Sequence, residues 1–72
     1  MTQKALEKIA GTQYQKTLEY KKAQRKNLEE AGHDAAADST KSSIAGYVQA
    51  MRDCGVITER ERGLLFIYYG TI

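Results

Sequence analysis

Few side chains in this chain are suited to covalent or metal chemistry, since it holds one histidine, His33, and one cysteine, Cys54. His33 stands beside Asp34, which is half of a possible catalytic dyad, but the pair follows a glycine in a stretch that reads as an exposed loop. Cys54 falls on an apolar helical face, where a thiol usually packs as a small hydrophobe. Nothing in the sequence brings the thiol and the imidazole together.

Other motifs for catalysis or cofactor binding are missing from the sequence as well. It contains no glycine-rich phosphate loop, no nucleophile elbow and no carboxylate pair with metal-ligand spacing. One cysteine rules out an internal disulfide, and one cysteine with one histidine cannot supply the usual ligand set of a zinc site. We therefore expect no enzymatic activity, no cofactor, no metal and no small-molecule substrate.

A basic run, KKAQRK at positions 21–26, is a candidate for phosphate binding. The cations concerned are Lys16, Lys21, Lys22, Arg25 and Lys26. Residues 1–32 carry seven basic and four acidic side chains, a net charge of +3, and Tyr14 and Tyr20 are near enough in sequence to stack on bases. The bland interpretation is a solvated helix face with i, i+3 and i, i+4 ion pairs: Glu19–Lys22, Arg25–Glu29 and Lys26–Glu30. Nucleic-acid binding is kept as the alternative function.

The C-terminal segment TERERGLLFIYYGTI, Thr58–Ile72, contains six large apolar or aromatic residues in a row. They are Leu64, Leu65, Phe66, Ile67, Tyr68 and Tyr69. On a helical wheel Leu64, Leu65 and Tyr68 share one face, Phe66 and Tyr69 share a second, and Ile67 lies between them. A helix that is apolar all round is normally buried.

A chain of 72 residues is too short to surround such a helix with its own elements. We therefore expect Leu64, Leu65 and Tyr68 to point inward and Phe66, Ile67 and Tyr69 to point outward. The run Leu64–Tyr69 as a whole is the candidate interface, together with the exposed side of the first helix, for a second copy of the chain or for another protein. The competing interpretation is ordinary closure of the core by a long first helix.

Length and charge restrict the remaining possibilities. The chain is expected to form a single domain over residues 1–72. Its net charge of +2 is too small to require a nucleic-acid or membrane partner. The longest apolar run, six residues, is far below the roughly 20 that cross a bilayer, and no signal-peptide pattern is present. We expect a cytoplasmic protein with no membrane contact.

The composition predicts an all-α fold, because proline is absent and alanine, lysine, glutamate, glutamine and leucine are plentiful. We expect one long N-terminal helix at about residues 2–31, packed against two short helices. Leu6, Ala10, Tyr14 and Leu18 form an i, i+4 ladder along the long helix. Gly11 and Thr12 interrupt it, and Thr12-x-x-Gln15 could be a capping box that starts a second helix. The ladder keeps its phase across Gly11, so we favour one continuous helix that ends before Gly32.

A connection is expected at residues 32–39, with Asp38, Ser39 or Thr40 as the next N-cap. The second helix should cover about residues 40–54, where the apolar face repeats every three or four positions at Ile44, Tyr47, Val48 and Met51. The third should cover about residues 58–69 and end at Gly70. Thr58 and Glu61 have the spacing of a capping box, which favours a helix over the rival interpretation of a strand at residues 65–69.

Overall fold

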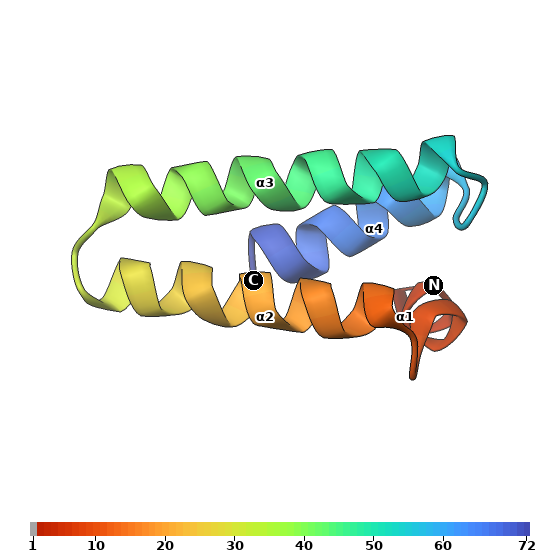
Figure 1. Ribbon diagram of the computed structural model, residues 1–72, viewed down its shortest axis with the longest axis horizontal. Coiled ribbons are helices and arrows are strands. Elements are labelled where there is room, and N and C mark those ends of the chain that lie inside the picture. The colour runs from red at the N-terminus through yellow and green to blue at the C-terminus, as the bar shows by residue number, and fades with distance from the viewer. Residues whose placement is uncertain (1) are drawn as a thin grey trace.

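The computed structural model describes residues 2–72 and confirms an all-α protein, with four helices where three were predicted. In chain order they are α1 Thr2–Ile9, α2 Gln13–Glu30, α3 Asp34–Asp53 and α4 Glu59–Gly70. Helices α2 and α3 form a long antiparallel hairpin, and α4 crosses it obliquely from the α3 side to the α2 side (Figure 1). Helix α1 packs beside the beginning of α4, at the end of the hairpin away from its connection.

The prediction of one continuous N-terminal helix was wrong, because the chain breaks at Gly11 and Thr12. Gly11 has a left-handed φ of +77°, which an L side chain rarely adopts. The Gln15 amide donates to the Thr12 hydroxyl at 3.4 Å, while the Gln15 side chain accepts from the Gly11 amide at 2.7 Å. These bonds satisfy donors at the start of α2. The break turns α1 toward α4; Leu6, Tyr14 and Leu18 of the predicted ladder still contact the core, whereas Ala10 is exposed.

The hairpin connection is much shorter than the predicted loop of residues 32–39, and α3 begins at Asp34. The reason is local, since three alanines extend the helix toward its N-terminus and Asp34 lies at the positive end of the helix dipole. His33 occupies the N-cap position and makes no capping hydrogen bond with its side chain. Gly32, with φ of +79°, ends α2 as predicted.

Helix α4 begins at the predicted capping box. The Glu61 amide donates to the Thr58 hydroxyl at 3.2 Å, and the Thr58 amide donates to the Glu61 carboxylate at 2.8 Å. Residues 65–69 are therefore helical. Gly70 is the last helical residue and lacks the left-handed conformation expected of a terminating glycine.

The core lies where α1, α3 and α4 meet the first half of α2. Its fully buried large side chains come from all four helices: Ile9, Leu18, Ile44, Val48, Leu65 and Tyr69. Within residues 2–72, no helix combines the length and apolar character needed to span a bilayer.

Candidate interaction surface

The rotation of α4 about its axis determines which part of the apolar run is free for contact. Leu65 and Tyr69, four residues apart, are fully buried, whereas Ile67 is 52% exposed. The prediction that Tyr69 points outward was therefore wrong, and neither Leu65 nor Tyr69 of the predicted interface is available for contact with a partner. Leu64 and Phe66 are half-buried on either side of the exposed stripe. One helix packed on a hairpin buries one stripe, and here that stripe follows the i, i+4 pair of Leu65 and Tyr69.

Tyr69 is held inward by polar as well as apolar contacts. Its hydroxyl donates to the Glu19 carboxylate at 3.4 Å. Burial, together with the nearby Glu19 charge, raises the pKa of Tyr69 to about 12. Tyr68 packs edge-on against the Tyr69 ring with centroids 4.9 Å apart, and the Lys22 ammonium lies 4.0 Å from the centre of the Tyr68 ring. These contacts fix the C-terminal half of α4 on α2.

The opposite side of α4 consists of Gly63, Leu64, Phe66 and Ile67, and we call it the α4 outer face. Ile67 is its most exposed apolar side chain. Gly63 lies one turn before Ile67, and a Cβ atom built on Gly63 would meet nothing within 4 Å. The Phe66 ring instead lies over Gly70, 3.0 Å from the position of a Cβ there. The surface of the outer face is therefore recessed at Gly63, which has no side chain, and protrudes at Ile67, whose side chain is exposed.

Ion pairs surround the N-terminal end of this surface. Lys8 on α1 pairs with Glu61 at 2.8 Å, and Arg62 pairs with Glu59 at 2.6 Å. The hydrogen bond from Lys8 is the main reason why the pKa of Glu61 lies below its ordinary value. Arg62 similarly lowers the pKa of Glu59, and Arg52 on α3 also contacts Glu59, at 3.1 Å. The first turn of α4 is therefore attached to both α1 and α3.

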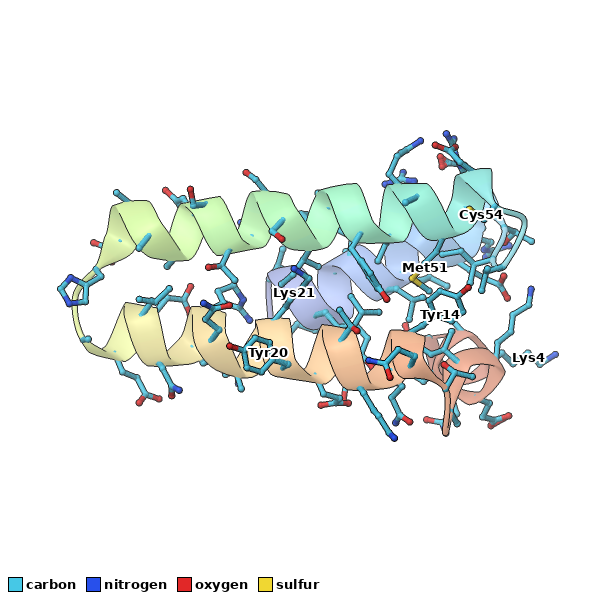
Figure 2. The ribbon with its side chains drawn as sticks, in the orientation of Figure 1. Lys4, Tyr14, Tyr20, Lys21, Met51 and Cys54 are labelled. Atoms are coloured by element: carbon cyan, nitrogen blue, oxygen red, sulfur yellow. The ribbon has the colours of Figure 1, made fainter. Side chains whose placement is uncertain are left out.

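The basic run predicted on α2 does not form one open cationic face. Lys21 donates to the Ser43 hydroxyl at 2.7 Å and reaches from α2 toward α3 (Figure 2). Lys22 lies over Tyr68, and Arg25 is only 3% exposed. Of the five predicted cations, Lys16 and Lys26 are the ones that are fully on the surface.

The burial of Arg25 was not predicted from the sequence. The predicted ion pair with Glu29 is present, at 2.9 Å. A charged residue in a basic run reads as part of a solvated face, but Arg25 follows Leu18 by seven residues and so shares its buried side of α2. This seven-residue spacing from Leu18 could have indicated that Arg25 is buried. Glu19, predicted to pair with Lys22, accepts a hydrogen bond from Tyr69.

His33 and Cys54 lie at the two ends of α3. Cys54 is exposed at the C-cap of α3, so the expectation that its thiol packs in the core was wrong. The reason is that α3 ends at Asp53 and its buried face ends at Met51, with Cys54 beyond both. His33 is exposed in the hairpin connection, as predicted. Across residues 2–72 there is no pocket and no group of three or more His, Cys, Asp or Glu side chains placed to hold a metal.

No protein-family model, no curated protein and no solved structure matches this chain.

Proposed function

We propose that this chain is a small, non-enzymatic interaction module that binds another protein chain through the α4 outer face, with a second copy of itself as the first partner to test. The observation that carries the proposal is the position of Ile67. It is 52% exposed in the middle of a short helix, with half-buried Leu64 and Phe66 beside it. Full burial of an isoleucine side chain contributes about 1.5–3 kcal/mol relative to full exposure, so a partner that covers this stripe would gain stability.

Gly63 gives the proposal independent support. A glycine inside a helix costs roughly 0.5–1 kcal/mol relative to alanine. No contact within the described chain requires it, because a Cβ at this position meets open space and its φ is not left-handed. A missing side chain on the outer face does, however, allow another helix to approach closely, since the distance between packed helices depends on the side chains at the crossing.

A second copy fits this surface on symmetry grounds. In a two-fold dimer the same patch meets itself, so Ile67 of one protomer would pack near Gly63 of its partner. The two α4 helices would then run antiparallel, which sets the positive end of each helix dipole beside the negative end of the other. The raised and lowered parts of one outer face would be complementary to those of the other.

The decisive experiment compares Ile67→Glu with Tyr20→Glu by sedimentation and light scattering over a range of concentrations. Tyr20 is 69% exposed on α2 and serves as a control for adding a charge to an exposed apolar position. We expect the unmodified chain and Tyr20→Glu to associate in the same way and Ile67→Glu to remain monomeric. If Ile67→Glu associates as strongly as the unmodified chain, the α4 outer face is not the dimer surface.

Nucleic-acid binding through the basic run has weaker support. Lys21 and Lys22 contact other groups of the chain, and Arg25 is buried. Retention on duplex or single-stranded nucleic acid that falls steeply with salt, and falls further on Lys16→Ala or Lys26→Ala, would favour this alternative.

A further inference from the structure

Arg25 is a buried cation whose hydrogen bonds are only partly made. Its side chain is almost entirely covered, and Nη1 donates to the Glu29 carboxylate at 2.9 Å. The other two guanidinium nitrogens, Nε and Nη2, each expose less than 1 Å² and have no hydrogen-bond partner among residues 2–72. A buried donor without a hydrogen-bond partner destabilises the folded state, and the cost is larger for a charged group. Two such donors on one buried arginine therefore require a physical explanation.

The two unpaired nitrogens have a geometry that selects a ligand. In a guanidinium group, Nε–H and Nη2–H point in parallel from one edge, at the spacing of the two oxygens of a carboxylate. Glu29 binds at Nη1 and thereby helps to hold the plane of the group. The free edge is therefore oriented in advance for a bidentate acceptor.

The position of Arg25 along the hairpin indicates from which side such an acceptor would arrive. Lys22, one turn earlier on α2, contacts the Tyr68 ring near the C-terminal end of α4. Arg25 follows Lys22 by about one turn in the direction of the hairpin connection, and α2 and α3 continue together to that connection (Figure 1). Lys21 pairs with Ser43, so the antiparallel register sets Arg25 opposite the turn that contains Ala37 and Lys41.

The surrounding charges leave a positive surplus that favours an anion. Lys26, exposed, follows Arg25 directly, and half-buried Lys41 lies on the facing turn of α3; no ion pair involves either within the described residues. Glu29 already offsets the charge of Arg25, so Lys26 and Lys41 supply the positive charge that a further anion would neutralise. The planar carboxylate is favoured by the shape of the free edge, whose two parallel N–H groups it can accept together.

We propose that Arg25 anchors an acidic side chain of a protein partner, with a glutamate or aspartate carboxylate accepting hydrogen bonds from Nε and Nη2. The side chains that cover the guanidinium must move aside for this, so a slender carboxylate on a flexible stem suits the site better than the bulky backbone of a nucleic acid. The site lies on the α2–α3 hairpin and does not involve the α4 outer face, so it goes beyond the function proposed above.

The test follows the Nε–H resonance of Arg25 by NMR in the ¹⁵N-labelled chain. Acetylated hexaglutamate is the probe, hexaglutamine is its neutral control, and inorganic phosphate is the competing anion. We expect a saturable downfield shift of the Arg25 signal with hexaglutamate, a much smaller shift with phosphate, and none with hexaglutamine. Arg25→Gln should weaken peptide binding about tenfold or more, whereas Lys26→Gln, which removes an exposed charge one residue away, should weaken it only about two- to threefold.

Three results would overturn the proposal. The first is an Arg25 signal that does not respond to hexaglutamate in the unmodified chain, a measurement that does not depend on how any variant folds. The second is equal weakening by Arg25→Gln and Lys26→Gln, which would indicate general charge attraction. The third is a larger response to phosphate than to the peptide.

Discussion

The Lys8 ammonium donates a 2.8 Å hydrogen bond to the Glu61 carboxylate, and this contact joins the first helix of the chain to the first turn of the last one. The same carboxylate oxygen accepts from the Thr58 amide at 2.8 Å. Glu61 therefore contributes to a local helix cap and to a tertiary ion pair through one atom. This arrangement fixes where α4 begins and how it is attached to α1.

Replacement of Thr58 by alanine should destabilise the protein by roughly 1 kcal/mol, because the Glu61 amide loses its acceptor at the N-cap. In a domain of this size that loss lowers the melting midpoint by about 4–8 °C. Thermal unfolding followed by circular dichroism measures it. Thr40→Ala is the matched control, since the Thr40 hydroxyl bonds a carbonyl within its own helix and caps nothing. An equal fall in both variants would contradict a specific role for the cap.

Stability should fall in acid partly because of Glu61. Its pKa in the folded protein is lowered, chiefly by the Lys8 hydrogen bond. A lowered pKa means that the unfolded chain binds the proton more readily, so the contribution is present above the ordinary glutamate pKa, about 4.3, and is lost as the pH falls through the folded value. Glu61→Gln should show a weaker acid dependence of the melting midpoint. Part of the dependence should persist, because the pKa of Glu59 is lowered as well.

The same ion pair can be examined one residue at a time. Lys8→Met should move the pKa of Glu61 upward toward its ordinary range, because the largest cause of the shift is removed. The Glu61 side-chain carbonyl signal in an NMR pH titration reports this directly. An unchanged Glu61 midpoint would mean that Lys8 and Glu61 do not pair in solution.

Replacement of Gly11 by alanine tests the break between α1 and α2 through the sign of its effect. If Gly11 lay inside a continuous helix, this change would stabilise the protein by up to about 1 kcal/mol, because alanine has a higher helix propensity than glycine. With φ at +77°, alanine must instead adopt a left-handed conformation, which costs roughly 1–2 kcal/mol. We expect a lower melting midpoint. Gly46→Ala in α3, where a Cβ meets open space, should raise it.

Gly63→Ala separates the needs of the fold from those of the proposed dimer. A Cβ at Gly63 meets nothing within the chain, so the monomer should gain up to about 1 kcal/mol in stability from the better helix propensity. If another helix crosses α4 at this point, the same methyl group should weaken association, measured by sedimentation. Gly46→Ala is the matched control, with a similar gain in stability and no effect on association. Unchanged association of Gly63→Ala would argue against a close crossing there.

The helix start at Thr58 could be predicted from the sequence because four consecutive residues determine it. The Gly11 break was harder, since the same stretch carried a continuous apolar ladder and a capping signal. Which of the two prevails depends on whether α1 gains more by continuing α2 or by turning to pack on α4. The outcome depends on tertiary contacts. The Lys8–Glu61 ion pair and the burial of Ile9 form only when the helices pack together.

The rotation of α4 about its axis could not be predicted from the sequence, because it also depends on tertiary contacts. Six apolar residues in a row leave the buried stripe ambiguous, and the hairpin selects Leu65 and Tyr69 by accepting the Tyr69 ring and its hydroxyl beside Glu19. Ile67 was correctly predicted to face outward, and Tyr69 was not. The start of α3 was also misplaced, since the helix begins at Asp34 and not at about residue 40 as the sequence suggested.

The hairpin has a further consequence, because its two ends are packed very differently. Toward α1 and α4 it is filled by the large side chains of Ile44 and Val48, whereas near the connection its buried residues are Ala37 and Arg25. The last turns of α2 and the first turns of α3 are therefore joined by less apolar area, with half-buried Leu28 the one large apolar side chain beside Ala37, and they should separate locally at a lower free energy than global unfolding. Amide hydrogen exchange should then be graded along the hairpin, fastest at the connection and slowest beside Val48. Such fraying would uncover the Arg25 guanidinium transiently while the core remains folded.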